Sequence, residues 1–270
     1  MDIKTKEHYN VDDLVEIVKI LRSPNGCPWD KVQTHETIRK DFIEEVYEAV
    51  EAIDDKDTEH LREELGDVLL QVVFHCVIET EKNSFTLDDV ADEVCRKMII
   101  RHPHVFGDVT ADTTEQVLKN WDAIKMETHS QKKPSEAMDS VSKTLPSLMR
   151  SEKLQKKASR AGLDYTDTNA ALNAVSERLE VLKKSVDEDD SGSYEKNIGQ
   201  LLFSVVALSR FLKTDCEQSL YNACEQFTEQ FKELENLAAQ RGIDIQSLDA
   251  KASGGLWNEI SKKEKNLEEI

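Results

Sequence analysis

The sequence predicts an all-α protein built from packed helices. Apolar residues recur at intervals of three and four along most of the chain, whereas the alternation typical of β-strands is scarce. The 270 residues include only nine glycines and five prolines, and no proline follows Pro146. Because these two residue types interrupt helices most often, their scarcity favours long, unbroken helices. The length allows one large domain or two small ones.

The composition narrows the partners that we expect. A net charge of -19 argues against nucleic acid and anionic membranes, since both need a basic protein surface. The chain has no run of 18 apolar residues to span a bilayer, and its first ten residues lack the apolar core of a signal peptide. Five scattered cysteines without CxxC spacing are typical of free thiols. We therefore expect a cytoplasmic protein.

The segment "DFIEEVYEAVEAI", Asp41 to Ile53, predicts the first helix of interest. Its apolar residues fall within a stripe of roughly 100°, which we expect to face the core. Glu45 and Glu48 are three residues apart and lie beside that stripe. This helix therefore places two carboxylates at the edge of its apolar face.

A second helix is predicted from about Glu59 to Glu79, and it is apolar around most of its circumference. A helix of this kind is usually buried, yet Glu64 and Asp67 share one narrow face of it. The connection "DDKDTEH" is short, so the two helices are expected to be antiparallel neighbours. This packing can bring the acidic pair of each helix opposite the other.

Four converging carboxylates favour a metal site. In a partly apolar setting they cannot all stay ionised unaided, and a divalent cation would offset their repulsion. Oxygen ligands favour Mg²⁺, with Mn²⁺ as a possible substitute. Solvation is the simpler interpretation for outward-facing acids such as Glu51 and Glu63. A ferritin-like di-iron site would need a Glu-x-x-His motif, which neither acidic pair has.

The chain also repeats itself. The segment "ELGDVLLQVVFHCV" from Glu64 matches "NIGQLLFSVVALSR" from Asn197 at an offset of 133, and Trp121 matches Trp257 at an offset of 136. A unit of about 130 residues is too long for a solenoid repeat and indicates a duplicated helical domain. We expect domains at 1–127 and 145–270, joined by a polar linker at 128–144.

The two copies differ at the acidic positions. At the offset of 133 the residues aligned with Glu45, Glu48, Glu64 and Asp67 are Arg178, Val181, Asn197 and Gln200. Neutral amides are poor substitutes for carboxylates as Mg²⁺ ligands. We therefore expect the first copy to carry the chemistry and the second to have kept the fold.

These residues resemble a known family. Glu44-Glu45-x-x-Glu48 followed by Glu64-x-x-Asp67 is similar to the signature of the MazG family, whose members are all-α nucleoside triphosphate pyrophosphohydrolases. The segments "GCPWDKVQTHETI", "RHPHVFGD" and "WDAIK" resemble its flanking motifs, and the resemblance covers essentially the whole chain. It implies duplicated helical-bundle domains, a homodimer, and hydrolysis of an NTP or dNTP to a monophosphate and pyrophosphate.

The resemblance also suggests roles for single residues. Glu45, Glu48, Glu64 and Asp67 would hold Mg²⁺, and Glu44 or one of these ligands would accept a proton from water. The candidates for substrate binding are the following residues: Trp29, Lys31, Lys97, Arg101, Trp121 and Lys125. His102 and His104 flank a proline and are interpreted as structural. A regulatory or scaffold protein with little turnover is the alternative, and a stricter enzyme acting on dUTP is a third hypothesis.

Overall fold

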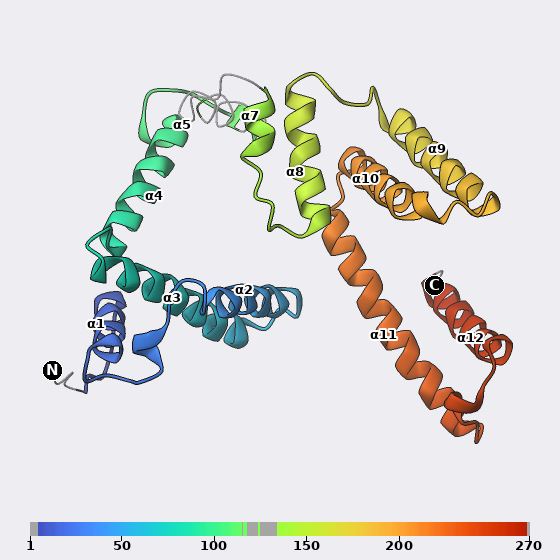
Figure 1. Ribbon diagram of the computed structural model, residues 1–270, viewed down its shortest axis with the longest axis horizontal. Helices are drawn as coiled ribbons and strands as arrows, with labels where there is room; N and C mark the ends of the chain where they lie inside the picture. Colours follow the sequence, from blue (N-terminus) through green and yellow to red (C-terminus); the bar gives the residue numbers. More distant parts are fainter. Residues whose placement is uncertain (1–4, 115, 118–123, 125–133, 269–270) are drawn as a thin grey trace. The chain divides into compact units, whose positions relative to one another are not determined.

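The computed structural model describes residues 5–114, 116, 117, 124 and 134–268, and helices are the regular structure of these parts (Figure 1). The all-α prediction is thus confirmed. The chain divides into two compact units, residues 1–129 and 130–270, each of which is described by itself. No described helix is both long enough and apolar enough to cross a bilayer.

The first unit is built around one long central helix. Its elements are α1 (Val11–Arg22), the 3₁₀ turn η1 (Asp30–Val32), α2 (Arg39–Asp54), α3 (Thr58–Glu81), α4 (Leu87–Arg101) and α5 (Pro103–Phe106). Side-chain caps fix the starts of three helices: Asn10 caps α1, Asp57 caps α3 and Thr86 caps α4. The turn of three residues between α2 and α3 makes these helices antiparallel neighbours, as predicted (Figure 1).

The core of the first unit lies where α1 and the segment before α2 pack against α3. Its buried members are Val18, Ile38, Val73, Phe74, Val77 and Ile78, with Leu14, Val15, Leu70 and Leu87 packed around them. Most of these residues come from the C-terminal half of α3. The N-terminal half of α3 is therefore left to pair with α2.

Most of the apolar stripe of α2 does not face the core of the first unit. The residues buried on α2 are Ala49 and Ala52. The stripe residues Ile43, Val46, Val50 and Ile53 are between 42% and 56% exposed. The prediction that the stripe packs inside this unit was wrong, because α2 pairs with α3 through its small side chains. On α3, Leu65 and Leu69 are also exposed, so that helix is less completely buried than its composition suggested.

The second unit contains a comparable antiparallel pair. Its elements are α7 (Pro134–Asp139), α8 (Ser147–Arg160), α9 (Thr168–Asp187), η2 (Ser191–Ser193), α10 (Tyr194–Leu212), α11 (Cys216–Gln240), η3 (Ile245–Ser247) and α12 (Ala250–Glu268). The helices α9 and α10 pair as α2 and α3 do. The segment predicted as a linker contributes to this unit, because α7 packs against α8 and Val141 is buried.

The pattern of burial repeats between the units at the offset of 133. Six pairs of residues at this spacing are buried in both: Ile38 and Ala171, Ala52 and Ser185, Glu64 and Asn197, Val73 and Val206, Phe74 and Ala207, and Cys76 and Ser209. The pairs come from both helices of each antiparallel pair, with Ile38 as the N-cap of α2. The similarity seen in the sequence thus extends to the packing of α2 and α3 on one side and α9 and α10 on the other.

Candidate metal centre

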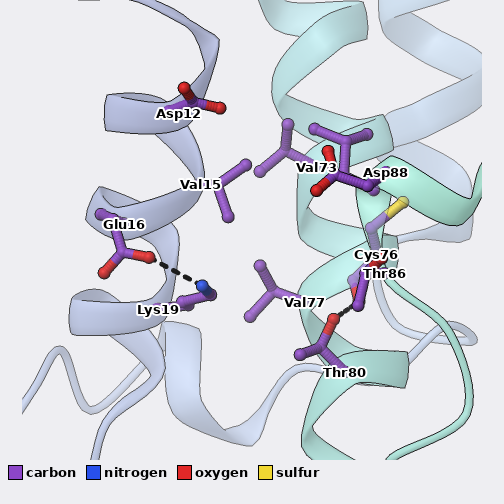
Figure 2. Close-up of a pocket in the computed structure, with 11 residues that line it drawn as sticks. Asp12, Val15, Glu16, Lys19, Val73, Cys76, Val77, Thr80, Thr86 and Asp88 are labelled. Carbon is purple, nitrogen blue, oxygen red and sulfur yellow. Dashed lines mark hydrogen bonds and ion pairs between the residues drawn. The ribbon is translucent and has the colours of Figure 1, made fainter. Parts of the chain in front are cut away.

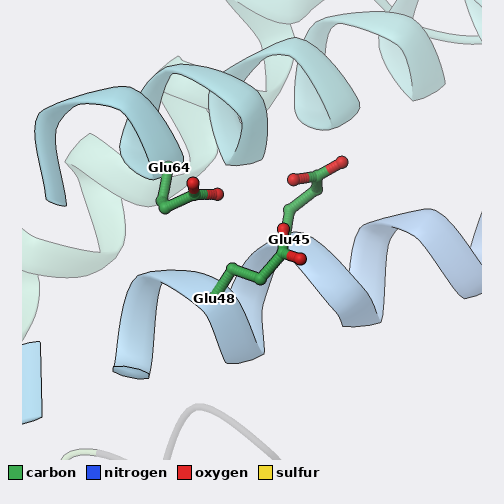
Figure 3. Close-up of side chains that lie close together, drawn as sticks. All are labelled: Glu45, Glu48 and Glu64. Carbon is green, nitrogen blue, oxygen red and sulfur yellow. The ribbon is translucent and has the colours of Figure 1, made fainter. Parts of the chain in front are cut away.

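Three carboxylates meet between α2 and α3. Glu45 and Glu48 reach from α2 into the space that Glu64 enters from α3 (Figure 3). One oxygen of each side chain lies within 4.8 Å of an oxygen of the other two. Glu45 and Glu48 are half-buried, whereas Glu64 is only 7% exposed. We call these three residues the acidic cluster.

Local sequence explains how the cluster forms. Residues three apart lie on one face of a helix, so Glu45 and Glu48 both face α3. The buried residues Ala49 and Ala52 have no bulk beyond Cβ, which lets the two helix backbones approach closely. The turn at 55–57 and the cap at Asp57 fix the register in which Glu64 arrives opposite them.

The electrostatics of the site show that the fourth predicted ligand is near. Burial raises the pKa of Glu45, and the charges of Asp67, Glu48 and Glu64 raise it further. Asp67 is half-buried on α3, one turn after Glu64. The structure therefore brings together all four carboxylates that the sequence singled out, three of them as a tight cluster.

Glu64 carries the clearest sign of a missing partner. Its Oε1 lies 2.9 Å from Nε2 of His60, but its Oε2 is buried without a hydrogen-bond partner. Leaving such an atom unpaired costs about 1–3 kcal/mol, and more when the group is charged. A hard divalent cation accepts carboxylate oxygens as ligands and would satisfy this atom. The residues present therefore fit a metal ion.

His60 was missed by the sequence reasoning. It precedes Glu64 by one helical turn, and the i, i+4 spacing puts both side chains on one face of α3. The search of the sequence considered only a histidine three residues after a carboxylate. The sequence pattern that could have identified His60 is a histidine four residues before a carboxylate.

Glu44, the predicted proton acceptor, is exposed on α2 and does not join the acidic cluster. Its Oε2 forms an ion pair of 3.2 Å with Nζ of Lys40. Its catalytic role stays a prediction.

The loop before α2 presents two further candidates. Trp29 is 59% exposed, and Lys31 is exposed in η1. Arg22 holds this loop in place: its Nη1 donates to the backbone oxygens of Asp30 and Gln33, at 2.7 and 3.1 Å. Its other nitrogens bind the carboxylate of Glu81 at 2.8 and 2.9 Å.

The remaining cation candidates lie elsewhere. Lys97 is exposed and Arg101 half-buried on α4, which follows the C-terminal end of α3 (Figure 1). Glu64 lies about 26 Å along the α3 axis before that end, at 1.5 Å per residue. The structure of one chain does not bring these two cations to the acidic cluster. Trp121 and Lys125 lie outside the described residues.

A separate cavity of about 310 Å³ lies among α1, α3 and the start of α4 (Figure 2). Val15, Val73 and Val77 line it together with Asp12, Glu16 and Asp88. Its lysine, Lys19, is paired with Glu16 at 2.7 Å. Acidic groups outnumber cations here, so the cavity suits a triphosphate poorly, and it contains none of the predicted site residues.

Comparison with known proteins identifies a family whose domain includes the acidic cluster. The model of the MazG nucleotide pyrophosphohydrolase domain matches residues 33–106, which include α2, α3 and all four carboxylates. The nucleoside triphosphate pyrophosphohydrolase of Escherichia coli K12 is 37% identical over 260 residues, which cover 95% of this chain and 99% of that protein. The chain belongs to the MazG family. The resemblance seen in the sequence is thereby confirmed.

Other MazG relatives match over nearly the same length. The nucleoside triphosphate pyrophosphohydrolase/pyrophosphatase MazG of Thermotoga maritima is 40% identical over 246 residues, with 91% of this chain and 93% of that protein covered. The uncharacterized protein YabN of Bacillus subtilis is 41% identical over 255 residues, or 92% of this chain and 51% of that protein. The similarity to MazG proteins therefore extends over both units.

Proposed function

We propose that this protein is a metal-dependent nucleoside triphosphate pyrophosphohydrolase. It would cleave an NTP or dNTP between the α- and β-phosphates and release a nucleoside monophosphate and pyrophosphate. The observation that carries the proposal is the unpartnered, buried Oε2 of Glu64 beside Glu45 and Glu48, in a chain of the MazG family. The related proteins of E. coli and T. maritima are named for this activity.

Mg²⁺ is the proposed ion, and Mn²⁺ its substitute, because the ligands are all oxygens. Glu45, Glu48, Glu64 and Asp67 would hold it. When bound, the ion neutralises phosphate charge and makes a water molecule more acidic. His60 orients Glu64 by its contact with Oε1, and Glu44 or one of the four ligands accepts the proton of the attacking water.

Substrate binding is assigned to the cations and aromatic rings that flank the acids. Trp29 and Lys31 are exposed on a loop that Arg22 holds rigidly, which suits them to contact a base and a phosphate. Lys97 and Arg101 on α4, with Trp121 and Lys125, are the further candidates for the triphosphate. The position of Lys97 and Arg101 on α4, beyond the C-terminal end of α3, favours an assembly in which a second chain supplies these two cations.

Exposed apolar side chains of the first unit support a proposed homodimer. Four stripe residues of α2, together with Leu65 and Leu69 of α3, remain accessible in the single chain. Exposed apolar residues gathered along a helix in this way are typical of a protein–protein interface. We propose that a second copy covers it, in accord with the dimer implied by the family.

The two units are proposed to be copies of one domain, of which the first is the working copy. The shared register of burial supports the duplication. The second copy has Arg178, Val181, Asn197 and Gln200 where the first has carboxylates. A regulatory protein with little turnover is the second candidate, and it is favoured only by this loss.

The test is pyrophosphate release from a panel of NTPs and dNTPs with Mg²⁺. Glu64→Gln is compared with Glu63→Gln, because Glu63 is the adjacent, exposed carboxylate of the same helix. We expect Glu64→Gln to lose at least a hundredfold in activity and Glu63→Gln to retain it. Equal activity of the two variants would refute the assignment. Nucleotide binding without turnover in the wild type would favour the regulatory candidate.

A further inference from the structure

The second unit contains a cleft of about 790 Å³ between α9 and α10. This volume lies within the range of small-molecule sites in proteins. Two cations, Arg178 and Lys196, line the cleft with the aromatic side chains of Tyr165 and Phe203. Gln200 and Glu195 contribute polar side chains to the same lining.

Two residues that line the cleft correspond to predicted metal ligands of the first unit. Arg178 and Gln200 correspond to Glu45 and Asp67 at the offset of 133. Nη1 of Arg178 donates to Oε1 of Gln200 at 3.0 Å, so these positions meet across α9 and α10 as the two acids interact across α2 and α3. The geometry of the pair is kept, while its charge has changed from negative to positive.

The buried polar position has also lost its need for a metal. Asn197 replaces Glu64 and is equally buried, but its Nδ2 donates to Oγ of Ser185 at 3.2 Å and to Oγ of Ser193 at 3.3 Å. Ser185 stands where the first unit has Ala52. The second unit thus has a neutral, hydrogen-bonded network at the position where the first unit has a carboxylate whose Oε2 is unpaired.

In the part of the chain that the structure describes, the two cations of the cleft are not engaged in ion pairs. Acidic residues outnumber basic ones by 54 to 35, and many cations of the second unit pair with carboxylates, as Lys183 does with Glu180 and Arg210 with Asp164. Within the described residues, neither Arg178 nor Lys196 has an ion-pair partner. Two cations and two aromatic rings outnumber the single carboxylate, Glu195, in the described lining of this cleft, which favours an anionic, aromatic ligand.

We propose that this cleft binds a nucleoside monophosphate without a metal ion. Arg178 and Lys196 bind the phosphate. Their two positive charges balance the two negative charges of a phosphate dianion. The rings of Tyr165 and Phe203, which are about two-fifths exposed, offer stacking surfaces for the base. Glu195 disfavours the additional charge of a di- or triphosphate and can accept a hydrogen bond from a ribose hydroxyl.

The first measurement is calorimetric titration of the full-length protein with AMP in EDTA. We expect one site per chain, with an affinity that falls as salt is added. The double variant Arg178→Gln/Lys196→Gln should bind at least tenfold more weakly. Lys183→Gln, which removes an exposed lysine of the same helix, and Glu64→Gln should bind like the wild type.

The controls separate this proposal from the catalytic one. Absence of AMP binding in EDTA would overturn it, as would weakening by Glu64→Gln but not by the double variant. Inorganic phosphate that binds as tightly as AMP would remove the role of the aromatic rings. If the double variant loses helicity, crosslinking of photoreactive AMP to the wild type decides, and label outside residues 165–204 would refute the site. Pyrophosphate release tests the first unit independently.

Discussion

Replacing Glu64 by glutamine should stabilise the metal-free protein. Carboxylate oxygens of the acidic cluster lie within 4.8 Å of one another. At that distance two unit charges repel by about 0.9 kcal/mol at a dielectric constant of 80 and about 3.5 kcal/mol at an effective value of 20. The variant also replaces the carboxylate at this buried position, where Oε2 has no partner, by a neutral amide, which costs less to bury. We expect Glu64→Gln to raise the free energy of unfolding of the first unit by about 1–2 kcal/mol in EDTA.

The same change should abolish stabilisation by the metal. A ligand that binds only the folded state adds about 2.7 kcal/mol at a hundred times its dissociation constant. Saturating Mg²⁺ should therefore reverse the order, so that the wild type becomes more stable than Glu64→Gln.

The assay is thermal and chemical unfolding in EDTA and in Mg²⁺, with hydrogen exchange of peptides from α2 and α3 to locate the effect. Glu63→Gln is the control, and it should follow the wild type in both conditions. If Glu64→Gln is destabilising in EDTA and still gains stability with Mg²⁺, the metal site is not where the acidic cluster lies.

Three further outcomes test other parts of the structure. Arg22→Ala should lower the free energy of unfolding of the first unit by about 2–3 kcal/mol in chemical unfolding, because charge-assisted hydrogen bonds are lost. It should also speed hydrogen exchange at residues 29–33. Unchanged exchange there would contradict the role of Arg22 in holding the loop. Burial and the charge of His35 lower the pKa of His75 from its ordinary value of 6.5. The unfolded state therefore binds more protons, and the free energy of unfolding falls as the pH drops below about 6.5. His75→Gln should flatten the profile of stability against pH in that range, and an equally steep profile would refute this reasoning. Ile43→Asp should dissociate the proposed dimer in analytical ultracentrifugation, whereas an intact dimer would show that another face forms the interface.

Acidification should also lower the stability of the first unit through Glu79. Hydrogen bonds from Lys82 and His35 hold the pKa of Glu79 at about 2, below its ordinary value of 4.5. This contribution to stability is therefore present above pH 4.5 and is lost as the pH falls towards 2. It lies outside the range in which His75 acts, so the two effects separate in an unfolding series against pH.

The parts of the site that sequence predicts well depend on local geometry. Spacing of three residues fixes Glu45 with Glu48, and Glu64 with Asp67, on one helix face each. The short turn then brings the two faces together, which is why the four carboxylates could be singled out. The helices expected at 41–53 and 59–79 are present as Arg39–Asp54 and Thr58–Glu81.

Other features depend on what covers a surface, and periodicity does not contain that information. An apolar stripe indicates that a face is buried by something, but not that the cover belongs to the same unit, as Ile43 and Val46 show. The polar composition of 128–144 likewise concealed α7 and the burial of Val141. The position of Lys97 relative to the acids depends on where α4 leaves α3, which is a tertiary property.

Two alanines that touch no ligand set the aperture of the site. Ala49 and Ala52 are the residues of α2 buried against α3, so their size determines how far apart the helix axes lie. That separation fixes the gap between the carboxylates and hence the ionic radius that they can enclose. A larger side chain at either position would favour Ca²⁺ over Mg²⁺, because Ca²⁺ accepts oxygen ligands at 2.3–2.6 Å and Mg²⁺ requires about 2.0–2.1 Å. Ion selectivity would then be encoded in the helix packing, away from the ligands themselves.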